Sequence, residues 1–243
     1  MFHPDGPTLR ELTAQALSST ETGYDLLAPK FDYTPFRTPD EILRAVAESL
    51  RAGPDLDWGL DLCCGTGAGM EMLRELCCEH VAGIDFSRRM LSVARQRLGA
   101  APGSERLEYV RGNALALPFG PVFDIVVCFG ALGHILEQDQ LLFTAEVARV
   151  LRPGGRFVFL TTYMPPLWSA MYWLGRGFNA VMHVRNLLVS PPFVMYYLTF
   201  LLPGVQGLLE QAGLEVQIRQ LDALAGRWGD LRLVTATRRG PST

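Results

Sequence analysis

The chain has 243 residues, of which 49% are hydrophobic and 19% are charged, so it holds enough apolar material for a buried core. This composition excludes an intrinsically disordered chain and, at about 150 residues per domain, favours one large domain. There are 22 basic and 25 acidic residues, and the resulting net charge of −3 argues against nucleic acid as a partner.

The N-terminal region and the cysteines indicate the compartment. The first thirty residues lack the basic start and continuous apolar stretch of a secretory signal peptide. The cysteines form two adjacent pairs, Cys63-Cys64 and Cys77-Cys78, and a single Cys128, which is not the spacing of a disulfide framework. Adjacent cysteines also lack the C-x-x-C spacing that lets two thiolates face one zinc ion, even with His80 nearby. We therefore expect a cytoplasmic protein with reduced thiols and no metal site.

Short β-branched runs alternate with helical patterns from about residue 40 to 163, which is typical of a parallel sheet flanked by helices. The Arg-Pro-Gly-Gly run at 152–155 predicts a chain reversal before the fifth strand. The last two strands have no helix between them, so we expect an antiparallel edge. The predicted helices are 40–51, 67–78, 87–98, 138–150 and 204–212, and the predicted strands are 58–63, 80–85, 107–111, 123–129, 156–162, 214–221 and 231–238.

The segment 164–203 interrupts this pattern with proline pairs and an apolar, aromatic composition. We therefore predict an α/β fold of the Rossmann-like, doubly wound type. Its mostly parallel seven-stranded sheet has an antiparallel last strand, and an apolar helical insertion follows the fifth strand. Within one domain we expect an N-terminal helical lid (1–54), an α/β core (55–163), the insertion (164–203) and a C-terminal part of the core (204–243).

A glycine-rich turn follows the first predicted strand in GLDLCCGTGAG, residues 59–69, and opens a helix. Backbone N–H groups in such a turn approach a ligand without obstruction from a Cβ atom. Asp85 ends the second strand, where a carboxylate is placed to accept hydrogen bonds from both hydroxyls of a ribose. Together the two features predict an adenosine site. A dinucleotide fingerprint would need glycine or alanine where Met70 stands, which disfavours a nicotinamide cofactor without excluding it.

Five sequence blocks then carry a family resemblance. They are DLCCGTG (61–67), GIDFSRRML (83–91), GNALALPF (112–119), FDIVVCFGALGHI (123–135) and LRPGGRF (151–157). In their order and spacing they resemble the class I S-adenosylmethionine-dependent methyltransferases, over about residues 55–163. The segments CCGTG and GNALALPF are most similar to those of the methyltransferases of ubiquinone and menaquinone biosynthesis.

The resemblance implies a set of cofactor-binding residues. The loop from Asp61 to Gly67 would hold the methionine part of S-adenosylmethionine, Asp85 its ribose, and Phe86 and Met90 its adenine. Asn113 stands where the family usually has aspartate, and its carbonyl still accepts a hydrogen bond from the adenine amino group. Cys63 replaces the first loop glycine, so we expect strand geometry there without a positive φ. The resemblance assigns to the cofactor site Asp61, Cys63, Gly65, Thr66, Gly67, Asp85, Phe86, Met90, Asn113, Ala114, Leu115, Phe129 and Gly130.

Residues 24–33, YDLLAPKFDY, resemble the N-terminal lid of the family, in which a tyrosine reaches the cofactor carboxylate. We therefore include Tyr24 and Tyr33 among the expected cofactor-binding residues. The alternative is that Tyr24, Leu27 and Phe31 form only the apolar face of a helix.

His134 follows the fourth strand, at the sheet edge where open α/β folds bind their ligands, and is our candidate general base. A histidine that caps or fills the loop before the helix at 138–150 is an equally good interpretation. Tyr163, Tyr172 and His183 are weaker candidates, because they lie in or beside the insertion and suit the wall of a site better than a catalytic role.

No acidic residue occurs between Glu146 and Glu210, while Arg176 and Arg185 lie within the insertion. Such a segment is typical of a lid over an apolar substrate, of a surface that touches anionic lipid, or of a dimer contact, and ordinary core helices remain an alternative. Arg176, Arg185 and the proline pairs interrupt it too often for a membrane-spanning helix. Weak attachment to a membrane surface, and either a monomer or a homodimer, are the expected consequences.

The function predicted from these features is methyl transfer from S-adenosylmethionine, with S-adenosylhomocysteine as product. The acceptor would be an oxygen or carbon atom of a hydrophobic small molecule of the quinol, prenylated or aromatic type. Two alternatives stay open at this point: a nicotinamide-dependent oxidoreductase, and a cofactor-binding module without catalysis.

Overall fold

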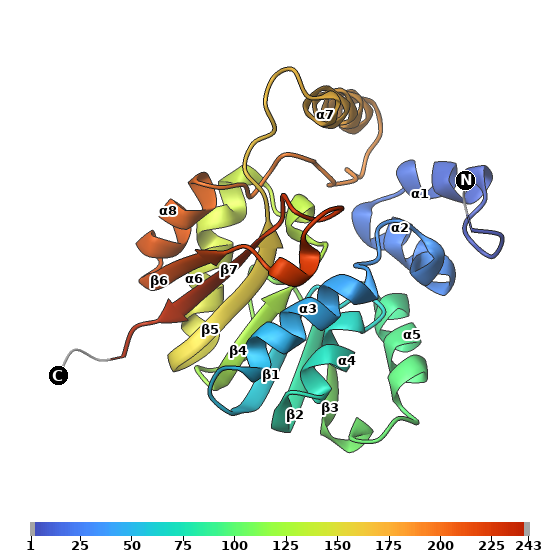
Figure 1. Cartoon of the computed structure of the whole chain (residues 1–243). Helices are drawn as coiled ribbons and strands as arrows, with labels where there is room; N and C mark the ends of the chain where they lie inside the picture. Colours follow the sequence, from blue (N-terminus) through green and yellow to red (C-terminus); the bar gives the residue numbers. More distant parts are fainter. Residues whose placement is uncertain (1–2, 241–243) are drawn as a thin grey trace.

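A computed structural model describes residues 3–240 and contains one seven-stranded sheet between two layers of helices (Figure 1). The sheet has the strand order β3-β2-β1-β4-β5-β7-β6, in which β1 pairs in parallel with both β2 and β4. The sheet confirms the expected fold class. The strands are β1 (Leu56–Leu62), β2 (Cys77–Asp85), β3 (Leu107–Arg111), β4 (Phe123–Cys128), β5 (Leu151–Thr161), β6 (Leu214–Arg219) and β7 (Arg232–Arg238).

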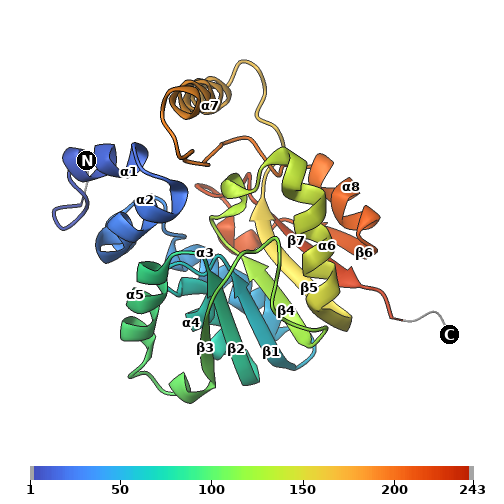
Figure 2. The ribbon, with the colours of Figure 1, turned by 180° about the vertical axis from the view of Figure 1, so that it is seen from behind.

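The helices divide into those that flank the sheet and those that lie beyond its strand ends. Helices α3, α4 and α5 cover one face and α6 and α8 cover the other (Figures 1 and 2). The α-helices are α1 (Leu9–Ala16), α2 (Thr20–Leu27), α3 (Asp40–Arg51), α4 (Ala68–Arg74), α5 (Arg88–Leu98), α6 (Gln140–Val150), α7 (Ala170–Leu188) and α8 (Gly204–Gln211), and the 3-10 turns are η1 (Ala28–Tyr33), η2 (Ser104–Arg106), η3 (Leu132–His134), η4 (Glu137–Asp139) and η5 (Asp222–Leu224).

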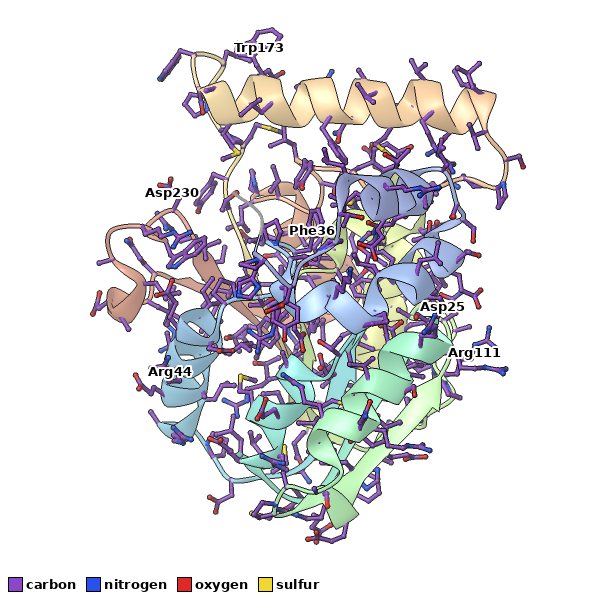
Figure 3. The ribbon with its side chains drawn as sticks, turned by 90° about the vertical axis from the view of Figure 1, so that its right-hand side faces the viewer. Asp25, Phe36, Arg44, Arg111, Trp173 and Asp230 are labelled. Atoms are coloured by element: carbon purple, nitrogen blue, oxygen red, sulfur yellow. The ribbon has the colours of Figure 1, made fainter. Side chains whose placement is uncertain are left out.

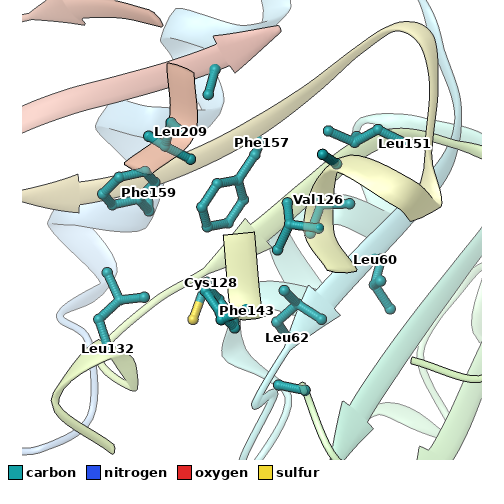
Figure 4. Close-up of a cluster of buried hydrophobic side chains, with 14 of the residues drawn as sticks. Leu60, Leu62, Val126, Cys128, Leu132, Phe143, Leu151, Phe157, Phe159 and Leu209 are labelled. Carbon is teal, nitrogen blue, oxygen red and sulfur yellow. The ribbon is translucent and has the colours of Figure 1, made fainter. Parts of the chain in front are cut away.

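Two apolar clusters hold the layers together because successive strand residues point to opposite faces of the sheet. On the α6 and α8 side, Phe143 and Leu209 pack against strand residues such as Phe157 (Figure 4). On the α3 and α4 side, Val46 and Leu73 pack against a second set from the same strands. Since the central strands are buried on both faces, the β1–β4 region forms a rigid support for the loops at its carboxyl end.

The last two strands form the antiparallel edge that the sequence predicts. Strand β7 runs antiparallel to both β5 and β6 and lies between them, so β6 forms the edge. The side chains of Leu233, Val234 and Ala236 in β7 are buried, whereas β6 exposes Glu215 and Arg219. The more apolar strand takes the interior position, and charged side chains protect the edge from pairing with other chains.

Two predicted boundaries are wrong, namely the end of helix α4 and the start of strand β5. Helix α4 ends at Arg74 rather than at residue 78, because Cys77 already pairs with β1 as the start of β2. Strand β5 begins at Leu151, so the Arg-Pro-Gly-Gly run is a bulge within the strand and not a separate reversal. Gly154 takes the positive φ of 82° that this bulge requires.

The predicted insertion contains one helix and one irregular segment. Helix α7 lies beyond the sheet, apart from the two helix layers, and residues 189–203 return from it to α8 without regular structure (Figure 1). The run FVMYYLTFLL at 193–202 belongs to this irregular part. Among residues 3–240, no helix is both long enough and apolar enough to cross a bilayer.

Candidate active site

A cavity of about 280 Å³ opens at the carboxyl ends of β1, β2 and β4. The strand order reverses between β1 and β4, and the loops that follow these strands leave the sheet in opposite directions. They therefore form a crevice, which α2, η1 and the irregular segment 189–203 cover. The position is the usual ligand site of an open α/β sheet.

Three alternate residues of the glycine loop between β1 and α4 have a positive φ. Cys63 has a φ of 54°, Gly65 of 51° and Gly67 of 86°. The left-handed value at Cys63 corrects the expectation of strand geometry, because the chain must turn sharply there whether or not the residue is glycine. A non-glycine residue in this region costs free energy, on the order of 1–3 kcal/mol. A Cβ atom at Gly69 would approach the Asp61 carboxylate to 2.5 Å, so the loop also closes tightly over that side chain.

Asp61 places a carboxylate under this loop. Its side chain is only 3% exposed, and its Oδ2 atom has no hydrogen-bond partner among the described residues. Burial raises the pKa of Asp61 to about 8, and the backbone N–H of Met70 and the nearby Asp85 are smaller influences of opposite sign. A buried acceptor without a partner is costly, so the position favours a ligand that brings a cationic donor.

Asp85 ends β2 on the other side of the loop. Its two carboxylate oxygens accept hydrogen bonds from the backbone of Gly65 at 2.9 Å and of Ser87 at 2.8 Å. Burial raises its pKa to about 6, against the effect of these two bonds. The carboxylate thus fixes the glycine loop to the start of α5 and retains lone pairs that face the cavity.

His134 and Tyr24 meet at the outer wall of the cavity. His134 Nδ1 lies 2.5 Å from the carbonyl oxygen of Val194, which only accepts, so Nδ1 carries the proton. Nε2 is then the acceptor in the 2.7 Å bond with the Tyr24 hydroxyl. Burial lowers the pKa of His134 below 6.5 and keeps the imidazole neutral. Burial also raises the pKa of Tyr24. Three separate parts of the chain therefore hold one basic nitrogen beside the cavity.

Two aspartates attach the N-terminal helices to the sheet edge. Asp32 in η1 accepts a 2.6 Å hydrogen bond from the Thr66 hydroxyl of the glycine loop. Asp25 in α2 accepts from the Ser87 hydroxyl at 2.6 Å and from the Arg89 backbone at 3.0 Å, at the start of α5. A free N–H group at the start of α5 stabilises the Asp25 carboxylate, and together the two contacts keep α2 and η1 over the cavity.

The insertion is attached to the N-terminal helices as well as to the sheet, where the Thr161 hydroxyl donates to the Phe200 carbonyl at 2.8 Å. The Arg185 guanidinium of α7 donates to the carbonyl oxygens of Ala16 at 2.7 Å and Ser18 at 2.6 Å. The Val194 backbone N–H donates to the Thr20 hydroxyl at 2.7 Å. This brings Met195 and Tyr197 into the cavity wall. Arg185 is therefore not free to meet lipid, which corrects half of the membrane argument made from sequence.

The structure brings most of the expected site residues together, and eleven of them line the cavity. Five others do not. Tyr33 stacks on His3, Gly67 packs against α5, and the Asn113 side chain accepts a hydrogen bond from the Leu115 backbone at 2.9 Å. Ala114 and Leu115 belong to the apolar cluster beneath. The eleven are Tyr24, Asp61, Cys63, Gly65, Thr66, Asp85, Phe86, Met90, Phe129, Gly130 and His134.

The weaker candidates for catalysis, Tyr163, Tyr172 and His183, lie outside the cavity wall. Sequence reasoning also missed cavity residues, for two reasons. Phe31 lies within the recognised YDLLAPKFDY segment and Arg37 shortly after it, whereas Met195 and Tyr197 come from an irregular segment without a motif. The missed residues are Phe31, Pro35, Phe36, Arg37, Thr38, Leu43, Cys64, Ala68, Gly69, Ala131, Met195 and Tyr197.

The fold and the position of the site define a Rossmann-like α/β protein with a nucleoside-type ligand site. Residues 60–159 match the family model described as a methyltransferase domain. We therefore identify this region as a methyltransferase domain, and it coincides with the five sequence blocks that resemble class I S-adenosylmethionine-dependent methyltransferases.

Curated relatives carry the name demethylmenaquinone methyltransferase. The protein of Shouchella clausii is 39% identical over 142 residues, which cover 56% of this chain and 58% of that protein. The protein of Bacillus licheniformis is 34% identical over 140 residues, with the same coverage. The chain therefore spans little more than half the length of these relatives.

Solved structures share the fold. An O-methyltransferase family protein from Burkholderia thailandensis has a TM-score of 0.68 at 18% identity, over 96% of this chain and 68% of that one. Phosphoethanolamine N-methyltransferase 2 of Haemonchus contortus, solved with S-adenosyl-L-methionine, has a TM-score of 0.62 at 19% identity, over 91% of this chain and 58% of that one. At these identities the likeness concerns the fold alone.

Proposed function

We propose that this protein is a methyltransferase that uses S-adenosylmethionine to methylate an oxygen or carbon atom of a hydrophobic small molecule. The observation that carries the proposal is the pair of buried carboxylates at the sheet edge. Asp61 offers an unpaired oxygen and Asp85 offers lone pairs at the end of β2, and burial raises the pKa of both. S-adenosylmethionine has an ammonium, a sulfonium and a ribose diol, which complement these groups.

The residues present fit this cofactor. The glycine loop and Asp61 would hold its methionine part, Asp85 its ribose, and Phe86 and Met90 its adenine, and the cofactor would supply an activated methyl group. Because the donor is already activated, orientation in a dry cavity is the main task of the protein and is worth roughly 7–11 kcal/mol. A general base adds roughly 3–5 kcal/mol.

We propose His134 as that base. Its Nδ1–H bond to Val194 fixes the tautomer, so Nε2 points its lone pair toward the Tyr24 hydroxyl. An acceptor hydroxyl that replaced the Tyr24 hydroxyl at this nitrogen would transfer its proton to Nε2 as the methyl group is attacked. Tyr24 then serves as a gate that occupies the basic nitrogen until an acceptor arrives, which differs from the contact with the cofactor carboxylate expected from sequence.

The acceptor is proposed to be apolar, of the quinol, prenylated or aromatic type. Phe31, Phe36, Phe129, Met195 and Tyr197 form much of the cavity wall, and the relatives named above carry a quinone-type substrate in their names. At about 280 Å³ the cavity lies near the lower limit of small-molecule sites, so a cofactor together with a large acceptor needs the covering segments to move. We accordingly propose the N-terminal helices and the insertion as lids over the acceptor side.

The test is incubation with methyl-labelled S-adenosylmethionine and an extract of cell lipids, followed by partition of the label between organic and aqueous phases. We expect label in the organic phase, none with boiled protein, and transfer to a short-chain quinol in the purified system. Label confined to water-soluble metabolites would disprove the apolar acceptor. Binding of S-adenosylmethionine without any transfer would leave a binding module, and tighter binding of NAD would indicate an oxidoreductase.

A further inference from the structure

The outward side of α7 is an apolar surface that no described residue covers. Residues at the spacing 173, 174, 177, 180, 181, 184, 187 and 188 lie on one side of a helix. Trp173 is 64% exposed, Leu174 68%, Val181 66%, Leu187 85% and Leu188 79%. We call this side, with Ala170, Gly177, Ala180 and Val184, the outer face of α7. Figure 3 shows α7 lying across one end of the molecule, with Trp173 directed away from the body.

The helix is inverted relative to an ordinary surface helix, whose polar side faces water. Three of its polar residues, Asn179, Arg185 and Asn186, point inward and bond to the protein itself. Asn179 donates to the Tyr197 carbonyl at 2.7 Å, Asn186 donates to the Phe193 carbonyl at 3.0 Å, and Arg185 binds the N-terminal helices. Of the 19 exposed large hydrophobic side chains among the described residues, 11 lie between residues 163 and 188. The apolar surface is thus concentrated in one segment.

The charges within the insertion itself are of one sign. The chain has no acidic residue between Glu146 and Glu210, and the exposed side chains beside the outer face include Arg176 and His183. Trp168, which is 88% exposed, precedes the helix, and Trp173 lies in its first turns. A Trp ring places an apolar body and one N–H donor at the boundary of a bilayer. An apolar strip with tryptophan at one end and positive flanks complements an anionic lipid surface.

The dimensions favour a bilayer over a second copy of the chain. Helix α7 has 19 residues, so it is about 28 Å long and about 10 Å wide. The surface area of one side of such a helix is smaller than the roughly 800 Å² that each partner buries in a stable complex. A bilayer has no such threshold, because its surface accepts the whole strip and adds electrostatic attraction.

We propose that the outer face of α7 docks this protein on the surface of membranes that contain anionic phospholipids. The docking is interfacial and reversible, with the strip among the lipid headgroups. The purpose of docking rests on the proposed function, because the insertion that carries the outer face also supplies Met195 and Tyr197 to the cavity wall. Docking would bring the acceptor side of the cavity to the lipid phase where apolar acceptors reside.

The experiment measures co-sedimentation of the purified full chain with two vesicle preparations, phosphatidylcholine alone and an equimolar mixture with phosphatidylglycerol. The test variant is L187E/L188E. The matched control is L141E/L142E, which alters two half-exposed leucines on α6, far from α7 in sequence and not part of the cavity wall. We expect the unaltered protein and the control to bind the mixed vesicles. The test variant should bind at least tenfold more weakly, and added salt should weaken binding of the unaltered protein.

A third variant, R176E, should weaken binding to the mixed vesicles several-fold while leaving the folded state unchanged by circular dichroism. Failure of the unaltered protein to bind either vesicle, or equal loss in the test and control variants, would overturn the proposal. So would a dimer, seen by sedimentation velocity, that L187E/L188E converts into a monomer without any vesicle binding.

Methylation of a short-chain, water-soluble quinol separates this proposal from the proposed function. If docking alone is correct, vesicle binding persists although no acceptor is methylated. If docking fails and the function is correct, the unaltered protein and L187E/L188E methylate the soluble acceptor equally well, and neither binds vesicles.

Discussion

The carboxyl edge of the sheet, where β1, β2 and β4 end at the cavity, and the segments that cover it are built in different ways. At the edge, the glycine loop and Asp85 are held by backbone hydrogen bonds and by strands that are buried on both faces. The cover, which comprises α1, α2, η1 and the insertion, is held by side chains such as Asp25, Asp32 and Arg185 that reach across to another segment. The edge is therefore rigid, while the cover combines these polar side-chain contacts with a few buried apolar residues such as Phe193 and Phe200.

This difference suits the two tasks of a group-transfer enzyme, which are to bind the cofactor and to admit and release the acceptor. A rigid half suits a ligand that is the same in every turnover, whereas a half closed by exchangeable hydrogen bonds suits an acceptor that must enter and leave. Variants at the edge should then change cofactor affinity, and variants in the cover should change turnover or acceptor entry. His134 lies at the junction, because its partners Tyr24 and Val194 both belong to the cover.

The largest effect is expected for His134→Ala. Turnover should fall by about 10²- to 10⁴-fold, the usual contribution of a general base, while affinity for S-adenosylmethionine changes little. Because burial lowers the pKa of His134, the neutral form persists below pH 6.5, so the unaltered enzyme should lose kcat only below that pH. Single-turnover rates against pH measure both expectations.

Tyr24→Phe is the matched variant for this pair, since it removes only the hydroxyl that occupies Nε2. It should keep substantial turnover if Tyr24 is a gate. Unchanged turnover in His134→Ala would instead assign that histidine to holding the loop in place.

Asp85→Ala should weaken S-adenosylmethionine binding by about 100-fold or more. Hydrogen bonds to a charged group contribute about 1.5–3 kcal/mol each, and the variant also frees the backbone N–H groups of Gly65 and Ser87. Isothermal titration calorimetry measures the affinity. Glu105→Ala, an exposed acid far from the cavity, is the control. A loss below threefold in Asp85→Ala would separate this carboxylate from the cofactor site.

Asp61→Asn should raise stability without ligand and lower cofactor affinity. The folded-state pKa of Asp61, about 8, lies above the ordinary value of 3.8. The contribution of Asp61 to the free energy of unfolding is therefore fully present below about pH 4 and is lost as the pH rises toward 8. Asparagine does not titrate, so at pH 8 the Tm of the variant should exceed that of the unaltered protein by at least about 4 °C. Calorimetry at pH 5 and pH 8 measures the difference, and an equal Tm at both values would contradict a buried, titrating Asp61.

Arg185→Ala should have the smallest effect. Loss of the bonds to Ala16 and Ser18 should cost about 1–2 kcal/mol of unfolding free energy and raise the acceptor KM several-fold, with cofactor affinity unchanged. Arg176→Ala, on the same helix but exposed, is the control with a soluble acceptor. A cofactor affinity that fell as much as the acceptor affinity would show that the cover and the edge act as one unit.

The local sequence pattern predicted the structure correctly where the position of a residue depends on its own strand or loop. The seven strands follow from their β-branched runs, and Asp61, Gly65 and Asp85 follow from their places beside strand ends. Boundaries failed where pairing with another strand overrode local signals, as at Cys77 and in the bulge around Gly154. The prediction of the site failed for a similar reason, because Met195 and Tyr197 reach the cavity through contacts between distant segments, such as the bond from the Tyr196 backbone to the Gly133 carbonyl.

The sequence by itself determined the class of fold and the cofactor half of the site, since the glycine loop and the strand-end acids are local features with a fixed spacing. Only the tertiary structure decided that Asn113 caps its own turn, that Tyr24 meets His134, and that the polar side of α7 faces inward. These outcomes depend on which distant segments pack together. Such packing balances burial against hydrogen bonding over the whole chain, and no local spacing encodes that balance.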